Sequence, residues 1–273
     1  MNTKQASSQL QKPLILVCND DGIRSEGIAA LAHAFQSVGD VWVVAPDREN
    51  SATSHSLSIH RPLRVERFDE QWLMVDGTPI DCVYLAIHHL LPRKPDLVVS
   101  GVNHGPNLGS DVIYSGTVAA AMEGHLCGCH SIAVSLVITE DHRLRKARHH
   151  FETAACVAAE LGAHVLASPP EKPVLLNVNC PDVPRDEVRG IRAVALGRVG
   201  WQHAVLERVD PRGRGYYWIA GDRNDAPVDP HGDVAAVAEG FASVTPLTTD
   251  LTQFSGLDLA TGLISGANYR SVV

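Results

Sequence analysis

Two adjacent carboxylates follow a short apolar run near the start of the chain. The run 14–18 consists of Leu, Ile, Leu, Val and Cys, and the residues after it are Asn19, Asp20, Asp21 and Gly22. Adjacent carboxylates repel each other unless a positive charge lies beside them, and a hard divalent cation with oxygen ligands provides that charge. The same four residues also favour a turn. From this stretch alone, a metal site and a plain turn are equally open interpretations.

Apolar runs with the length of buried strands recur through the first two thirds of the chain. They cover 14–18, 41–45, 96–100, 132–138 and 174–179. Between the first two runs, apolar residues from Ile28 to Phe35 recur at helical spacing behind Ser25, a helix-capping residue type. A later helix is predicted over about 143–165, with a basic, histidine-rich start. This alternation predicts an α/β fold, a Rossmann-like three-layer α/β/α arrangement with a mostly parallel sheet. Ligands of such sheets bind beyond the carboxyl ends of the strands, where Asp20 and Asp21 lie.

Two further predicted strands also end in polar loops. The loop after the second strand contains Ser51, and the loop after the third, 101–111, is rich in Gly, Pro, Asn and Asp. That loop leads to Ser115, Gly116 and Thr117, which precede an alanine-rich helical pattern. A helix N-terminus with free backbone N–H groups and two hydroxyls suits an anion. A plain helix cap is the alternative interpretation.

The composition describes an acidic globular protein. The 273 residues carry a net charge of −8, which disfavours a surface for nucleic-acid polymers. No apolar run reaches the roughly 20 residues that a helix needs to cross a bilayer, so we expect no membrane association. Residues 1–12 lack the apolar segment of a signal peptide, which predicts a disordered tail and a cytoplasmic protein. The six cysteines are interpreted as structural thiols, the close pair Cys127 and Cys129 included.

The amino-acid composition of the chain changes at about residue 190. Aromatic residues gather between 201 and 218, and Gly and Arg between 210 and 215 interrupt short strand-like pieces. This pattern predicts β-hairpins that project from the core, and such hairpins commonly mediate self-association, so we expect a homodimer or homotetramer. We therefore divide the chain into a disordered tail, a Rossmann-like catalytic core, and a C-terminal hairpin and oligomerisation region that returns to the core, covering 1–12, 13–189 and 190–273.

Six short motifs occur in a fixed order between about residues 13 and 252. They are Asn19-Asp20-Asp21-Gly22, Ala45-Pro46-Asp47-Arg48 running to Ser51, Gly77-Thr78-Pro79, Ser100-Gly101-Val102-Asn103-His104-Gly105, Tyr114 to Glu123, and Asp210-Pro211-Arg212-Gly213-Arg214. With these motifs the chain resembles the SurE family, stationary-phase survival proteins that act as metal-dependent 5′/3′-nucleotidases. The resemblance implies hydrolysis of nucleoside 5′- and 3′-monophosphates to nucleoside and phosphate. Some family members also cut short polyphosphate.

The resemblance also implies roles for particular residues. One divalent ion per subunit, Mn²⁺ or Mg²⁺, would be held by oxygen atoms of Asp20, Asp21, Ser51 and Asn103. The phosphate contacts would come from Asn107, Ser115, Gly116 and Thr117. The proposed metal ligands are all hard oxygen donors from three strand ends, which agrees with such an ion.

The proton transfers of the reaction are assigned to two candidates. Asp20 is the candidate general base, and His104 is better placed than His55 or His60 to protonate the leaving oxygen. The sequence departs from the family pattern at His104, at 127–130 and at 230–233. None of these departures affects a proposed metal ligand, so they concern substrate preference rather than the reaction.

A second interpretation comes from another class of protein. A non-catalytic, nucleotide-binding regulatory module could use the same edge of the sheet without hydrolysis. Paired carboxylates argue against it, because without a metal they repel a phosphate. The Gly-x-Gly-x-x-Gly pattern of dinucleotide sites is absent after the first strand, which argues against an NAD enzyme.

Overall fold

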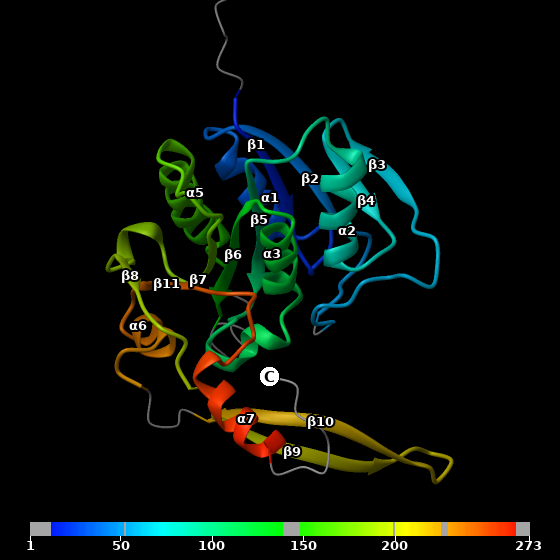
Figure 1. Ribbon diagram of the computed structural model, residues 1–273. Coiled ribbons are helices and arrows are strands. Elements are labelled where there is room, and N and C mark those ends of the chain that lie inside the picture. The colour runs from blue at the N-terminus through cyan, green and yellow to red at the C-terminus, as the bar shows by residue number, and fades with distance from the viewer. Residues whose placement is uncertain (1–11, 52, 139–147, 199, 225–228, 266–273) are drawn as a thin grey trace, which may run out of the picture.

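The computed structural model describes residues 12–51, 53–138, 148–198, 200–224 and 229–265. Within these residues a nine-stranded sheet runs through the molecule in the order β3-β4-β2-β1-β5-β6-β7-β11-β8 (Figure 1). Its parallel centre comprises β4 (Trp72–Val75), β2 (Asp40–Pro46), β1 (Leu14–Cys18), β5 (Leu97–His104), β6 (His130–Val137) and β7 (Leu175–Pro181). At the edges, β3 (Val65–Asp69) is antiparallel to β4, β11 (Ala242–Pro246) is antiparallel to β7, and β8 (Ile191–Ala193) is parallel to β11.

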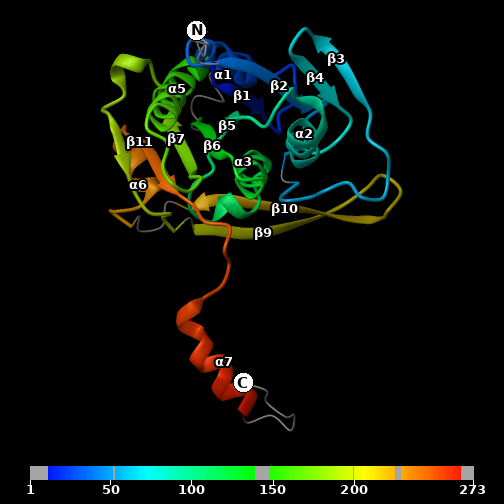
Figure 2. The same cartoon turned by 45° about the horizontal axis from the view of Figure 1, so that its top comes forward.

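Helices cover both faces of the sheet. One face carries α1 (Glu26–Phe35) and α5 (Phe151–Ala167), and the other carries α2 (Pro79–Leu85) and α3 (Gly116–Leu126) (Figures 1 and 2). The side chains of β1 alternate accordingly: Ile15 and Val17 join the core beneath α1 and α5, whereas Leu16 and Cys18 join the core beneath α2. The predicted three-layer fold with a mostly parallel sheet is therefore confirmed.

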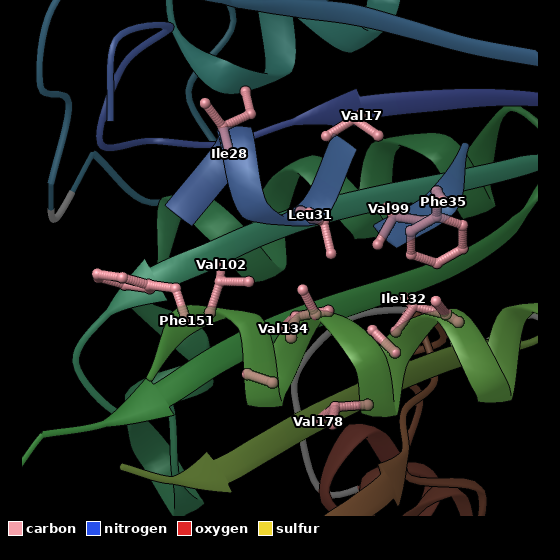
Figure 3. Close-up of a cluster of buried hydrophobic side chains, with 14 of the residues drawn as sticks. Val17, Ile28, Leu31, Phe35, Val99, Val102, Ile132, Val134, Phe151 and Val178 are labelled. Atoms are coloured by element: carbon pink, nitrogen blue, oxygen red, sulfur yellow. The ribbon is translucent and has the colours of Figure 1, made fainter. Parts of the chain in front are cut away.

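The larger core shows why α1 lies where the sequence pattern places it. Ile28, Leu31 and Phe35 are completely buried and project toward strand residues such as Val17 and Val99 (Figure 3). The helix begins after Ser25, whose hydroxyl accepts a hydrogen bond from the Ile28 N–H at 3.4 Å. The helix cap and the apolar stripe thus hold the start of α1 next to the loop that follows β1.

The strand order creates a switch point at the centre of the sheet. From β1 the chain builds outward to β2, β4 and β3, and it then returns to the other side of β1 to form β5. Connections that leave in opposite directions open a crevice at the carboxyl ends of the two strands. The Asp20–Asp21 pair follows one of these strands, and Asn103 lies near the end of the other.

The C-terminal part combines a projecting hairpin with a return to the sheet. The strands β9 (Gly200–Val209) and β10 (Gly215–Asn224) form an antiparallel ribbon that extends from the molecule (Figure 1). Its described side chains include the exposed apolar residues Val205, Tyr217, Trp218 and Ile219. The chain then forms α6 (Asp233–Ala238) and enters the sheet as β11. The predicted projecting hairpin is confirmed, whereas its role in oligomerisation stays a prediction.

A second exposed element lies at the C-terminal end. The helix α7 (Leu257–Ser265) points away from the sheet (Figure 2), and its apolar residues Leu259 and Leu263 are both 70% exposed. No sequence feature led us to predict this helix.

One predicted helix boundary is wrong. We expected a helix from about Arg143, but α5 begins at Phe151, and residues 148–150 are not helical. His149 and His150 instead contact the carboxylate of Asp182 with their ring nitrogens, at 2.8 and 3.0 Å. Residues 139–147 lie outside the described part of the chain, as does the predicted disordered tail except Lys12.

None of the described helices is both long enough and apolar enough to cross a membrane. The predicted division of the chain at 12/13 and 189/190 stays a prediction.

The close packing of α1 on β5 gives a first test. A Cβ atom at Gly27 would lie 2.0 Å from the carbonyl oxygen of Val102. We expect Gly27→Ala to lower the free energy of unfolding by about 1–3 kcal/mol, because the helix must move away from the strand. Gly262→Ala in α7 is the matched control, because nothing lies within 4 Å of its position. Urea unfolding that shows equal stability for both variants would contradict this packing.

Candidate functional site

The carboxylate of Asp20 connects the end of β1 to the start of α3. Asp20 is only 4% exposed, and its Oδ1 accepts a hydrogen bond from the Thr117 hydroxyl at 2.5 Å. The same hydroxyl oxygen lies 3.3 Å from Oδ1 of Asn103. A hydroxyl has one proton and can satisfy only one of these acceptors at a time. Three elements therefore bring oxygen atoms together without a positive charge among them.

The first turn of α3 is shaped to receive this carboxylate. A Cβ atom at Gly116 would lie 2.8 Å from Oδ2 of Asp20, so only glycine fits without a shift. Ser115 caps the helix, because its hydroxyl accepts the Val118 N–H at 3.0 Å. The positive end of the helix dipole thus faces an acidic side chain. Ser115, Gly116 and Thr117, predicted as phosphate contacts, lie together with Asp20.

Asp21 has a different partner from Asp20. Its Oδ2 accepts the backbone N–H of His104 at 3.2 Å, which ties it to the end of β5. Asn103 is held at that end through its own amide group, which donates to the Gly105 carbonyl at 2.9 Å. The two carboxylates and Asn103 therefore converge around the ends of β1 and β5.

A bulge in β5 sets the position of Asn103. The pairing with β6 is regular up to Ser100, which lies opposite Ala133, and it resumes at Asn103, which lies opposite Ser135. Between these two pairs β5 therefore contains one residue more than β6. The bulge passes through Gly101 with φ +132°, and a Cβ atom there would lie 2.2 Å from the Val134 carbonyl oxygen. Only glycine tolerates this path.

Ser51 is not drawn into the cluster. The residue is exposed, and its hydroxyl donates to Oε1 of Glu49 at 2.9 Å. Within the described residues no hydrogen bond joins it to Asp20, Asp21 or Asn103. Its loop is nevertheless attached to the site, because the Asn50 N–H donates to the Asp20 carbonyl at 2.7 Å. The ligand role of Ser51 stays a prediction that requires its side chain to turn.

Asn107 anchors the long loop after β5. Its carbonyl accepts hydrogen bonds from the side chains of Asn177 and Asn179, at 2.8 and 3.0 Å, and its own amide group donates to Ser135 at 2.8 Å. Its backbone N–H donates to Oδ1 of Asn179 at 2.8 Å. The amide nitrogen of the predicted phosphate contact is thus already engaged in the fold.

Of the three candidate histidines, only His104 contacts the cluster. It is exposed, and its ring lies 5.1 Å from the ring of His149. His55 instead pairs with Glu123 at 3.0 Å, and among the described residues no hydrogen bond or ion pair joins His60 to Asp20 or Asp21. His104 also lines a hollow of about 350 Å³ that opens beside Asp21. A larger hollow of about 650 Å³, lined by Arg93, lies by the amino ends of the strands and contains none of the predicted site residues.

Sequence reasoning missed two aspartates that support the site from a distance. Asp182 is buried, and its carboxylate contacts the Nδ1 atoms of both His149 and His150. Asp233 is completely buried and accepts the backbone N–H groups of Gly109 and Gly197 at 2.9 and 2.7 Å. Each lies at a position that the sequence pattern can indicate, because Asp182 directly follows strand β7 and Asp233 is the first residue of α6. Their partners, however, lie far away in the sequence.

Burial disfavours the charged forms of both Asp20 and Asp21. Desolvation raises the pKa of Asp20 to about 6, in part opposed by the Thr117 hydrogen bond and reinforced by the neighbouring Asp21. Burial also raises the pKa of Asp21. The charge of Glu49 raises this pKa further, whereas the hydrogen bond from the His104 N–H lowers it. A cation would relieve both shifts.

The residues present fit a hard divalent ion. The oxygen atoms of Asp20 and Asn103 share one hydroxyl, and Asp21 adds a second carboxylate. No group of three or more His, Cys, Asp or Glu side chains in the described part of the chain is arranged to hold a metal. The predicted set contains only two residues of these types, so it depends on Asn103, Ser51 and water to complete the coordination.

Fold and site together define a Rossmann-like α/β protein with an acidic, oxygen-lined crevice at its switch point, bordered by a helix N-terminus. Comparison with known proteins then places it: the family model described as survival protein SurE matches residues 15–203, and the chain belongs to the SurE family.

Individual relatives are similar to this chain over most of their length. A protein named 5′-nucleotidase SurE from Anaeromyxobacter sp. (strain Fw109-5) is 51% identical over 239 residues, which cover 86% of this chain and 90% of that protein. Its namesake from Geotalea daltonii is 47% identical, with 89% of this chain and 96% of that protein covered. The crystal structure of the SurE protein from Aquifex aeolicus superimposes with a TM-score of 0.82 at 40% identity, covering 92% of this chain and all of that one. The resemblance seen in the motifs is thereby confirmed.

The raised pKa of Asp20 predicts how a substitution changes stability. The folded state holds the proton more tightly than the unfolded state, so this group favours folding below about pH 4, and the benefit is lost as the pH rises through 6. In metal-free protein we expect Asp20→Asn to raise the free energy of unfolding by about 3 kcal/mol at pH 8 and to change little at pH 4.

Urea unfolding at both pH values measures this difference. Asp250→Asn is the matched control, because a backbone hydrogen bond from Thr252 lowers the pKa of this exposed carboxyl. It should give no stabilisation at pH 8. Equal stability of Asp20→Asn and the unmodified protein at pH 8 would contradict the electrostatic picture of the site.

Proposed function

We propose that the chain is a metal-dependent phosphomonoesterase that hydrolyses nucleoside 5′-monophosphates, and also 3′-monophosphates, to nucleoside and phosphate. The nucleotidase assignment rests on membership of the SurE family and on relatives that bear the name 5′-nucleotidase. The observation that carries the metal dependence is the buried Asp20 carboxylate, which shares the Thr117 hydroxyl with Asn103.

The cation would be held by Asp20, Asp21 and Asn103, with Ser51 as a further ligand. Either Mn²⁺ or Mg²⁺ suits such oxygen donors, one ion per subunit. When bound, the ion supplies a Lewis acid that polarises a phosphate oxygen and lowers the pKa of a water molecule.

The protein groups around the ion have separate tasks. Backbone N–H groups in the first turn of α3, with the Thr117 hydroxyl, would neutralise charge on the phosphoryl oxygens. Asp20 is the candidate general base, because its buried carboxylate would lie beside the proposed ion and the water molecule bound to it. His104, next to Asp21 through its backbone N–H, is the candidate acid for the leaving oxygen.

Further properties belong to the same proposal. A homodimer or homotetramer would bury the apolar ribbon side chains Tyr217 and Trp218. Short polyphosphate is a possible second substrate class, and a cytoplasmic location stays a prediction.

The direct test is phosphate release from a panel of nucleoside monophosphates by chelator-treated protein. We expect release only after Mn²⁺ or Mg²⁺ is added. Asp21→Asn should abolish metal-dependent release, whereas Asp250→Asn should retain it. Nucleotide binding without hydrolysis under either metal would support the regulatory-module interpretation instead, and release by Asp21→Asn with undiminished metal binding would refute the ligand assignment.

Ser115→Ala separates the phosphate contacts from the metal ligands. Because Ser115 caps α3, its loss should cost about 1 kcal/mol in unfolding free energy. The variant should raise KM for the nucleotide while leaving the Kd for Mn²⁺ unchanged, since the hydroxyl is no metal ligand. Calorimetric titration with Mn²⁺ and steady-state kinetics measure the two quantities, and a parallel loss of both would contradict the separation.

A further inference from the structure

The hollow beside Asp21 has an unusual lining. It measures about 350 Å³, within the range of small-molecule sites. Its walls come from the end of β1, the first turn of α1, the end of β5 and the segment before α5. They include Asp21, Glu26, Gly27, His104, His149 and Phe151.

Three of these residues form an aromatic cluster. The rings of His104 and His149 meet edge to face at 89°, with their centroids 5.1 Å apart. Phe151 lies 6.0 Å from each of the two imidazoles. The three rings therefore pack against one another in one part of the lining, next to a proposed metal ligand, with Phe151 buried behind the more accessible imidazoles.

The ring of His149 is fixed in place. Its Nδ1 lies 2.8 Å from Oδ2 of Asp182, a carboxylate that is only 4% exposed. The other oxygen of Asp182 accepts the backbone N–H of His150 at 2.8 Å and contacts the His150 ring at 3.0 Å. The acid thus holds the segment before α5, and the position of His149 does not depend on a ligand.

The charges of the hollow indicate which part of a nucleotide would fit. Asp21 and Glu26 place two carboxylates on its walls, and because only Asp21 is a proposed metal ligand, the charge of Glu26 disfavours a phosphate in the hollow. An uncharged aromatic ring is favoured, because bases stack on aromatic side chains irrespective of their sequence identity. The anion-binding turn of α3 lies on the opposite side of Asp20.

We propose that this hollow is the nucleobase subsite of the enzyme, with His149 as a stacking residue oriented by Asp182. The inference rests on the proposed nucleotidase function and deepens it. The substrate would lie across the switch point, with its phosphate at the start of α3 and its base in the hollow, against the imidazole of His149.

Two substitutions at one position separate stacking from hydrogen bonding. His149→Asn can keep a hydrogen bond to Asp182 but lacks the ring, whereas His149→Phe keeps an aromatic surface and loses that bond. His150→Asn is the matched control, because His150 shares Asp182 but does not line the hollow. Thermal unfolding of each variant reports whether the segment before α5 remains folded.

The kinetic test compares AMP with glycerol 2-phosphate, which has no base, in the presence of Mn²⁺. We expect His149→Asn to raise KM for AMP about tenfold, the scale of one lost base–aromatic contact, with kcat unchanged. His149→Phe and His150→Asn should retain the KM for AMP, and no variant should alter the kinetics with glycerol 2-phosphate. An unchanged KM for AMP in His149→Asn, equal losses on both substrates, or an equal loss in His149→Phe would each overturn the proposal.

Binding of adenosine, measured by calorimetry without metal, keeps this inference distinct from the proposed function. Hydrolysis of both phosphate esters, with adenosine binding that is absent or unaffected by His149→Asn, would refute the subsite but retain the phosphatase. Adenosine binding that is weakened by His149→Asn but not by His149→Phe, without hydrolysis of either ester, would retain the subsite and refute the phosphatase.

Discussion

The buried carboxylate of Asp20 is the interaction on which the site depends. It joins the end of β1 to the first turn of α3, and Gly116 leaves room for it. Burial opposes its ionisation, so in the absence of a cation the folded chain holds this group at an energetic disadvantage. Perturbed carboxylates in a crevice are typical of functional sites, because structural packing alone does not require them. The oxygen atoms that surround it are the basis of the proposed cation site.

Close approaches of the backbone allow this arrangement. The loop after β1 carries Gly22 at φ +93°, where a Cβ atom would lie 3.1 Å from the backbone of Arg48. At Gly101 and Gly27 the corresponding distances to carbonyl oxygens are 2.2 and 2.0 Å. Gly22 thus brings the loops after β1 and β2 together, Gly27 brings the start of α1 onto β5, and Gly101 brings β5 close to β6. The site is thus built from backbone proximity first and from side-chain chemistry second.

The features that the sequence predicts well are local. Strand runs, the cap at Ser25 and the polar residues after each strand depend on neighbours within a few positions, and all of them appear in the structure. The order of the strands was not predicted; in the structure it places β1 beside β5, so that their carboxyl ends meet at a switch point. The roles of individual residues came from the family resemblance, and for Ser51 the structure shows an exposed side chain turned toward Glu49. Its role as a ligand cannot be derived from spacing.

The features that sequence reasoning missed are long-range. The sequence predicts a helix with a basic, histidine-rich start here, but His149 and His150 precede α5 and contact Asp182, more than thirty positions away. Asp233 contacts Gly109 across 124 positions. No periodicity reports such pairs, since they depend on how β7 and α6 lie against the loops.

The long-range contacts of Asp233 and Asp182 support the site from the two faces of the sheet. Asp233 and Asn107 hold the loop that leads to α3, and Asp182 holds the segment that leads to α5, on the opposite face of the sheet. A ligand bound at both must cross the carboxyl ends of β1 and β5, over the Asp20–Asp21 pair. Asp20 contacts the first turn of α3, whereas Asp21 contacts the end of β5 and lines the hollow beside α1 and α5. On this argument the adjacency of Asp20 and Asp21, which first suggested a metal, would also separate the proposed phosphate contacts from the proposed base subsite.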